Sequence, residues 1–370
     1  MHEPISGPAF FIGKGDDALI SFGSGQPDMP PPIEAFNILK TYTRFKYGLI
    51  QGEESLRAAI APQYPGAAAE HFVITNGASE AIDLVLRVIS ESGAKANPTQ
   101  SDARPEGFRV LLPRPYYYSY PHNVHFAGMT PVYYDLEKGK INFETFKEAL
   151  EGCSAVMINS PSNPTGTVQE VETLKQIEKL CEEKGTYVIS DEVYKDIIYV
   201  RENYLLHGPR VVTVNSFSKT YGMCGLRVGY VYSQNKKLIE DIIEMKTHTA
   251  MNTSTVGQMM ALAALRSPKS YIAHNLETWK TRRDLMFNGM KELGLDLWSP
   301  EGAFYVLPKF KNSTQAMSDL YHTHKVITYD GAWFGAPGRL RFSYALDEQK
   351  IIEGLRRVRE FLGREYASYS

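Results

Sequence analysis

The architecture of the chain is visible in one stretch, residues 155–194, which reads AVMINSPSNPTGTVQEVETLKQIEKLCEEKGTYVISDEVY. Two short apolar runs, 155–159 and 187–190, flank a segment of helical period at 171–183. Short apolar strands separated by helices are typical of a parallel sheet that is covered on both faces. The stretch therefore predicts a βαβ unit.

The same alternation extends on both sides of that unit. It changes near residue 235, where longer amphipathic helices begin and fewer strands separate them. We expect further strands at 72–75, 109–112, 131–134, 211–214 and 228–232, with helices at 78–90, 118–127 and 143–150. Beyond residue 234 we expect helices at 235–248, 255–265, 269–293 and 347–361, and strands near 303–307 and 339–343.

These elements predict an α/β fold with two unequal domains. A large three-layer domain with a mostly parallel, seven-stranded sheet is expected over residues 47–234. A smaller α+β domain is expected from both ends of the chain, residues 1–46 and 235–370, with an interdomain helix in the second part. Residues 93–107 are polar, contain two prolines and lack periodicity, which predicts a surface insertion.

Composition excludes several classes of function. The chain has 370 residues, with 40 Lys and Arg against 42 Asp and Glu, so its formal net charge is −2. This balance gives no electrostatic reason to expect nucleic acid or an anionic membrane as a partner. No apolar run approaches the roughly 20 residues that span a bilayer. The 3 cysteines lie far apart and no secretory signal is visible, so we expect a reduced, cytoplasmic protein.

Polar side chains follow three of the predicted strands directly. Asn163 comes after 155–159, Asp191 and Tyr194 come at the end of 187–190, and Lys219 follows 211–214. Because the carboxyl ends of parallel strands meet at one edge, these side chains should converge on one crevice. Residues 75–79 join a strand to a helix start, which favours anion binding. Histidine and cysteine spacings suggest no metal site.

This ensemble resembles the class I/II pyridoxal-phosphate-dependent aminotransferases of fold type I, with features like those of the aspartate and aromatic enzymes. The resemblance covers nearly the whole chain. It is carried also by Gly25-Gln26-Pro27-Asp28, by Tyr47 followed by Gly52 and Leu56-Arg57, and by Arg339-Leu340-Arg341-Phe342-Ser343.

The resemblance implies a role for each residue that contacts the cofactor ring. Lys219 would form a Schiff base with the aldehyde of pyridoxal 5'-phosphate and then shuttle the substrate proton. Asp191 would pair with the ring nitrogen and keep it protonated. Tyr194 and Asn163 would hydrogen-bond the phenolic oxygen. Tyr117 would stack on the ring, with Tyr116 as a one-residue alternative.

It also implies which residues bind the cofactor phosphate and the substrate. The substrate α-carboxylate would be held by Arg341 in a bidentate fork, with Gly25 and Asn163 on the same side of the pocket. Tyr47 would reach the phosphate from the partner subunit, which implies a homodimer with shared active sites. The other phosphate ligands would be Ala78, Ser79, Ser216, Ser218 and Arg227.

The implied activity is transfer of an amino group from an L-amino acid to a 2-oxo acid by a ping-pong mechanism. The alternative is a C–S β-lyase or decarboxylase of the same fold. A transcriptional regulator of this fold would need an N-terminal DNA-binding segment, and we do not expect one. The donor stays open among aspartate, aromatic amino acids, alanine and others. Some aspartate-preferring relatives carry a basic residue where this chain has Ser79, which argues against a strictly dicarboxylic substrate.

Overall fold

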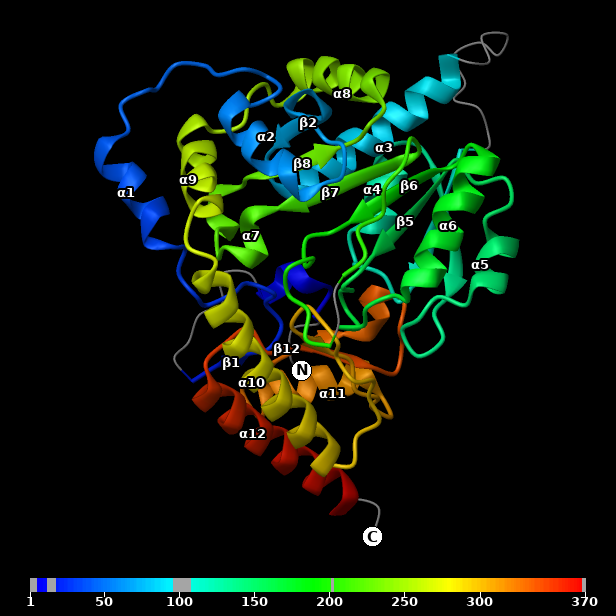
Figure 1. The fold of residues 1–370 in the computed structure, drawn as a ribbon. Coiled ribbons are helices and arrows are strands. Elements are labelled where there is room, and N and C mark those ends of the chain that lie inside the picture. The colour runs from blue at the N-terminus through cyan, green and yellow to red at the C-terminus, as the bar shows by residue number, and fades with distance from the viewer. Residues whose placement is uncertain (1–4, 12–17, 96–107, 201–202, 368–370) are drawn as a thin grey trace.

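The fold is built around one large β-sheet (Figure 1). The computed structural model describes residues 5–11, 18–95, 108–200 and 203–367. In these ranges a seven-stranded sheet has the order β2-β8-β7-β6-β5-β3-β4. β8 is antiparallel to both of its neighbours, and the other neighbouring pairs are parallel, which confirms the predicted sheet. The strands are β2 Phe72–Thr75, β3 Arg109–Arg114, β4 Thr130–Asp135, β5 Ala155–Asn159, β6 Tyr187–Asp191, β7 Val211–Ser216 and β8 Gly229–Tyr232.

Helices cover both faces of this sheet, because successive side chains of a strand point to opposite sides. In β5, Met157 belongs to the core beneath α3, α4 and α8, whereas Val156 and Ile158 belong to the core beneath α5 and α6. On that second face, α2 and α9 cover the β2–β8 end of the sheet. These helices are α2 Glu54–Ile60, α3 Gly77–Lys95, α4 Tyr120–Phe126, α5 Phe143–Ala149, α6 Val171–Lys184, α8 Lys236–Thr249 and α9 Thr255–Leu265.

Two small sheets lie below the large one in Figure 1 and combine distant parts of the chain. In the first, Ile20 of β1 pairs with Val326 of β10. In the second, β12 lies between β11 and β9 and is antiparallel to both. Three helices pack with these strands around a core that includes Trp279, Phe304 and Phe342. The elements are β1 Ile20–Ser21, β9 Tyr305–Val306, β10 Val326–Ile327, β11 Tyr329–Asp330, β12 Leu340–Ser343, α10 Ser270–Glu292, α11 Ser313–His322 and α12 Glu348–Ala367.

Several predicted bounds differ from the observed ones. The strand expected at 303–307 is shorter, and the last helix continues beyond residue 361 to Ala367. Helix α3 reaches Lys95, so the first residues of the insertion predicted at 93–107 are helical; residues 96–107 lie outside the described ranges. The physical reason is that polar residues alone do not end a helix when no proline interrupts it.

Short helices were the least visible elements in the sequence. The predicted elements do not include α1 Ile33–Thr41, α2 or α11, each of fewer than three full turns, although the equally short α4 and α5 were predicted. Helix α1 packs through Ala35 into the core shared by Phe72 of β2 and Met260 of α9. The first 46 residues therefore pack against a helix that covers the large sheet as well as pairing with the small ones, and the domain boundaries at 46/47 and 234/235 stay a prediction.

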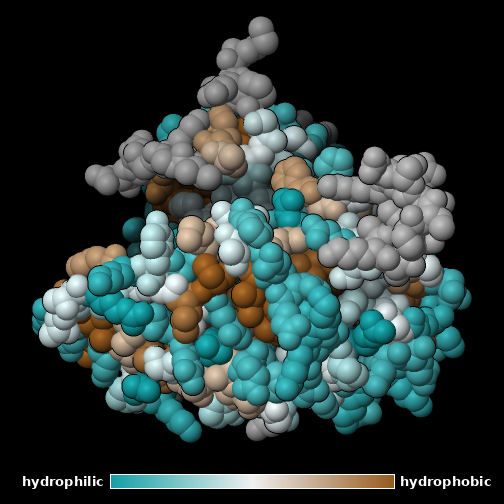
Figure 2. Space-filling view, turned by 90° about the horizontal axis from the view of Figure 1, so that it is seen from above, coloured by the Kyte–Doolittle hydropathy of each residue, from teal (hydrophilic) through white to brown (hydrophobic). Residues whose placement is uncertain are grey.

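One face of the molecule is seen from above in Figure 2. The face seen in Figure 2 is mostly hydrophilic, with separate hydrophobic patches between the polar side chains. Among the described residues, no helix combines the length and the hydropathy that a membrane crossing requires.

Candidate active site

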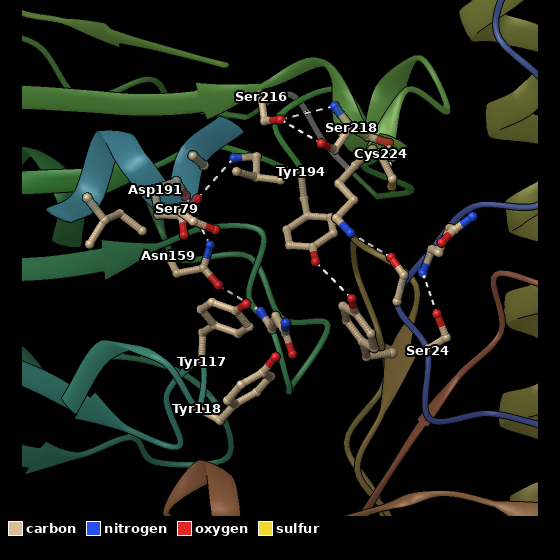
Figure 3. Close-up of a pocket in the computed structure, with 18 of the residues that line it drawn as sticks. Ser24, Ser79, Tyr117, Tyr118, Asn159, Asp191, Tyr194, Ser216, Ser218 and Cys224 are labelled. Carbon is tan, nitrogen blue, oxygen red and sulfur yellow. Dashed lines mark hydrogen bonds between the residues drawn. The ribbon is translucent and has the colours of Figure 1, made fainter. Parts of the chain in front are cut away.

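The carboxyl ends of β5, β6 and β7 open into a cavity of about 360 Å³. Its other walls come from the start of α3, residues 23–26 and the small sheets. Asn159 and Asp191 lie near Ser79 on one side in Figure 3, and Tyr194 points across toward the side that carries Ser24. Among the predicted site residues, those that line this cavity are Gly25, Ala78, Ser79, Tyr117, Asn163, Asp191, Tyr194, Ser216, Ser218, Lys219, Arg227 and Arg341.

The reactive amine of the cavity is that of Lys219. It lies on α7 Phe217–Thr220, the short helix that follows β7, and its Nζ donates a hydrogen bond to the backbone oxygen of Gly25 at 2.7 Å. Burial lowers the pKa of Lys219, and the positive charges of Arg341 and Arg227 act in the same direction. The amine therefore reaches its uncharged, nucleophilic form at a lower pH than an exposed lysine does.

A buried carboxylate lies across the cavity at the end of β6. Asp191 Oδ2 accepts a hydrogen bond from the hydroxyl of Tyr120 at 2.6 Å, and Oδ1 accepts one from the backbone N–H of Val193 at 3.2 Å. Burial raises the pKa of Asp191 to about 6, although these hydrogen bonds and the charge of Lys219 oppose the shift. The ionised form would therefore gain from a cationic partner in the cavity.

The amide side chain of Asn159 fixes the backbone around this carboxylate. Its Nδ2 donates to the backbone oxygen of Asp191 at 3.0 Å, and its Oδ1 accepts from the backbone N–H of Asn163 at 2.7 Å. Asn163 in turn accepts a hydrogen bond from Arg341 Nη1 at 2.9 Å through its side-chain oxygen. These contacts link the ends of β5 and β6 to the guanidinium on β12.

Arg341 is a buried cation enclosed by aromatic rings. Its guanidinium carbon lies 4.5 Å from the ring centroid of Tyr305, 4.8 Å from that of Tyr329 and 4.7 Å from that of Phe334. Its Nη2 donates to the backbone oxygen of Gly23. Its buried Nε has no hydrogen-bond acceptor in the part of the chain that the structure describes. The side chain can therefore accept a further anionic partner.

The opposite end of the cavity offers donors for an anion. Ala78 and Ser79 begin α3, and Ser216 and Ser218 lie beside them, with the two Oγ atoms 2.8 Å apart. Arg227 donates from Nη2 to the backbone oxygen of Asn76 at 3.3 Å. Backbone N–H groups at a helix start together with an arginine are suited to phosphate.

Two tyrosine predictions have different outcomes. Tyr117 lines the cavity, whereas the alternative Tyr116 does not and packs against Tyr133 instead, with 5.6 Å between ring centroids. Tyr47 does not line the cavity of its own chain, and 81% of its surface is exposed. Its role in a partner's site stays a prediction.

Several residues that line or support the cavity were not predicted. The hydroxyl of Tyr305 lies 2.8 Å from that of Tyr194, and burial raises the pKa of both phenols. Asn159 could have been found, because it is the polar last residue of a predicted strand. Gln26 and Tyr118 adjoin the predicted Gly25 and Tyr117 in the sequence, whereas Tyr305 and Tyr329 approach through tertiary packing. The residues other than Asn159 that were not predicted are Gly23, Ser24, Gln26, Ile82, Tyr118, Val193, Cys224, Tyr305 and Tyr329 in the lining, and Tyr120 behind Asp191.

An amine, a carboxylate and a guanidinium gathered at the strand ends of an α/β sheet define an enzyme that acts on small charged molecules. Residues 17–358 match the family Aminotransferase class I and II. The chain belongs to this family and is an aminotransferase. Its family is one that uses pyridoxal 5'-phosphate.

Known relatives and solved structures match almost the whole chain. A probable aspartate/prephenate aminotransferase of Aquifex aeolicus is 34% identical and aligns over 94% of this chain and 92% of its own. The aspartate aminotransferase of Thermotoga maritima is 31% identical, over 95% and 93%. The aromatic aminotransferase of Pyrococcus horikoshii superposes with a TM-score of 0.84 at 29% identity, over 97% and 99%. These names do not favour the lyase or decarboxylase alternative.

The raised pKa of Asp191 leads to a prediction about stability without cofactor. The folded protein binds this proton more tightly than the unfolded chain, so the contribution to stability is present below the unfolded pKa near 4 and lost as pH rises through about 6. We expect Asp191→Asn to raise the free energy of unfolding at pH 8 by on the order of 2–3 kcal/mol and to change it little near pH 4. Urea unfolding at both pH values measures this difference.

The matched control is Asp135→Asn, since Asp135 ends β4 at the edge of the same sheet with its side chain 74% exposed. We expect no comparable pH-dependent gain there. Equal effects of Asp191→Asn at both pH values would contradict the assignment of this titration to Asp191.

Proposed function

We propose that the cavity binds pyridoxal 5'-phosphate and that the enzyme moves an amino group from an L-amino acid to a 2-oxo acid in two half-reactions. The observation that carries this proposal is the amine of Lys219 in one cavity with the buried side chains of Asp191 and Arg341. Its lowered pKa suits an amine that must act as nucleophile and proton carrier.

The chemistry of the described side chains fits this cofactor. The donors around Ser79 and Arg227 suit its phosphate, and the buried carboxylate of Asp191 suits a protonated ring nitrogen. Asn163 uses its amide oxygen for Arg341, which leaves its Nδ2 for the ring oxygen beside Tyr194. The cavity of about 360 Å³ lies within the ordinary range for small-molecule sites.

When bound, pyridoxal 5'-phosphate supplies an aldehyde that takes up the amino group and a ring that withdraws electrons. Arg341 would hold the substrate α-carboxylate and so present the Cα–H bond to Lys219. Lys219 Nζ would take the proton from Cα and deliver it to the carbon that bore the aldehyde. Asp191 would keep the ring nitrogen protonated. In the second half-reaction the 2-oxo acid would use the same Arg341 contact.

Exposed apolar side chains near the N-terminus support a homodimer. Ile33, Leu39 and Leu49 are more than half exposed, and Phe45 is 84% exposed beside Tyr47. Large apolar groups gathered on one surface segment favour a protein interface. We place Tyr47 of each subunit at the partner's phosphate site. All three cysteines are unpaired, which supports a reducing compartment such as the cytoplasm.

The charged residues that line the cavity indicate which substrate side chains the site can bind. Among the described residues that line the cavity, the Lys and Arg side chains are Lys219, Arg227 and Arg341, and each has a role above. Because residue 79 is a serine and not a basic residue, it offers no positive charge to the second carboxylate of a dicarboxylic substrate. Although two relatives above are named for aspartate, we propose donors with uncharged side chains.

The central test uses one amino acid and no 2-oxo acid. Wild-type enzyme loaded with pyridoxal 5'-phosphate should release at most one equivalent of 2-oxo acid per site and then stop, as the cofactor absorbance changes once. We expect Lys219→Ala to slow this half-reaction by roughly 10²–10⁴-fold, because the proton carrier is removed. Lys195→Ala removes a lysine outside this cavity and serves as the control. Continuous release of ammonia would indicate a lyase, and failure of the wild type to bind cofactor would refute the proposal.

Shared active sites can be tested by mixing two inactive variants. Lys219→Ala and Tyr47→Ala subunits would form hybrid dimers in which one site carries both changes and the other carries neither. After random exchange we expect about a quarter of the wild-type activity, since half of the dimers have one intact site. Mixtures that stay as inactive as the separate variants, despite exchange shown by mass spectrometry, would exclude a shared site.

Donor preference can be measured in single half-reactions, which need no acceptor. We expect phenylalanine or alanine to react roughly tenfold or more faster than aspartate at low concentration, because no described cation remains for a second carboxylate. Ser79→Lys should raise the rate with aspartate selectively, and Ser79→Thr is the matched control. A wild type that prefers aspartate would overturn the proposal on the side chain while leaving aminotransfer intact.

A further inference from the structure

An ion pair outside the cavity holds the start of α3. Lys246 lies on α8, its side chain is 0% exposed, and its Nζ donates to Glu80 Oε2 at 2.8 Å. The side chain of Glu80 is 14% exposed. Both residues are described, and neither belongs to the cavity lining. The pair joins α8 to the turn directly before Ala78 and Ser79, the residues that offer N–H groups to an anion. Figure 1 shows these two helices close together on one side of the large sheet.

Glu80 uses its other contacts to hold the residue before the helix. Its Oε2 also accepts from the backbone N–H of Asn76 at 2.6 Å, and its Oε1 accepts from Asn76 Nδ2 at 3.1 Å. Gly77 follows with a φ of +77°, and a Cβ there would lie 2.4 Å from Arg227 Nη2. The carboxylate therefore fixes a turn that only glycine can make beside Arg227.

The contacts of Glu80 place a negative charge where a bound phosphate would also be negative. A helix start attracts anions, and the carboxylate of Glu80 is already an anion there, one residue from Ser79. In a partly buried site its charge would repel a bound phosphate, because water screens it poorly. A buried lysine is in turn costly unless an anion pairs with it. Lys246 thus neutralises Glu80 near the anion site, and Glu80 offsets the cost of burying Lys246.

We propose that Lys246 is a positioning residue that neutralises Glu80, so that the carboxylate can fix the Asn76–Gly77 turn without repelling the cofactor phosphate. This inference rests on the proposed binding of pyridoxal 5'-phosphate in the cavity. A pair that served only to join α8 to α3 would affect stability and would not distinguish ligands with and without a phosphate.

Pyridoxal lacks the phosphate and otherwise presents the same ring and aldehyde, so the two ligands separate these roles. Dissociation constants of both are measured on the full-length, cofactor-free protein by quenching of its fluorescence. We expect Lys246→Met to weaken binding of pyridoxal 5'-phosphate by roughly tenfold, since the charge of Glu80 near the start of α3 is then no longer neutralised, and to leave pyridoxal binding unchanged. Inorganic phosphate should compete less well with the cofactor in this variant.

Two further variants test whether the neutralisation of Glu80 by Lys246 is what matters for phosphate binding. The double variant Glu80→Gln/Lys246→Met removes both charges and should return affinity for pyridoxal 5'-phosphate toward the wild-type value. Lys237→Met makes the same substitution on the exposed face of α8, where Lys237 pairs with Asp241, and should leave both ligands unaffected. Additive losses in the double variant would contradict the proposal.

The outcomes separate this inference from the proposed function. If wild-type protein binds no pyridoxal 5'-phosphate, the proposed function fails. If the wild type binds it and Lys246→Met binds it equally well, or loses both ligands equally, only this inference is overturned. Should Lys246→Met not fold, Glu80→Gln carries the test: it removes the negative charge, so its affinity for pyridoxal 5'-phosphate relative to pyridoxal should be at least that of the wild type. A lower ratio would overturn the inference.

Discussion

The site depends on one constraint, which is that parallel strands end together at the same edge of a sheet. Asn159 pairs in register with Asp191, and Asp191 pairs with Val214, so the segments after β5, β6 and β7 leave the sheet side by side. Because β8 runs the other way, it begins where β7 ends, with Gly229 opposite Ser216. The reversal of this one strand brings Arg227 to the start of α3.

The second half of the site comes from the two ends of the chain. Arg341 on β12 donates to the backbone of Gly23, and the backbone of Gly25 accepts from Lys219. Residues 23–25 therefore run between the guanidinium and the amine. A Cβ on Gly25 would lie 2.1 Å from the hydroxyl of Tyr305, so only glycine lets this segment pass so close to the aromatic wall. The small sheets thus set the distance between the guanidinium of Arg341 and the amine of Lys219.

The sequence predicted those parts of the site that depend on local order along the chain. Asp191 ends the apolar strand β6 and Lys219 lies on the short helix after β7, so strand patterning brings them to the same edge of the sheet. Tyr305 and Tyr120 were not predicted, because each reaches the site across a tertiary contact, to Tyr194 and to Asp191. The hydrophobic period predicted the middle of α3, but its end was not predicted, because Gly93, a common helix stop signal, lies inside the helix.

Neighbouring acids show how strand alternation separates two environments. Asp191 faces the cavity, whereas Glu192 points to the other side of the sheet edge, where Tyr64 and Ser190 donate to it and burial raises its pKa to about 7. Only the first carboxylate can meet a ligand.

The cavity that would meet a ligand therefore has more permanent positive charges than negative ones. The carboxylate of Asp191 stands against two permanently charged guanidinium groups, the buried one of Arg341 and the exposed one of Arg227. A phosphate and a substrate carboxylate would balance the two arginines, and a ring cation would balance Asp191. Because a phosphate carries about −1.5 to −2 and the carboxylate −1, these groups would leave the site slightly negative with Lys219 uncharged. The net charge of −2 for the whole chain conceals this arrangement, since the surface charges outnumber the few that are buried.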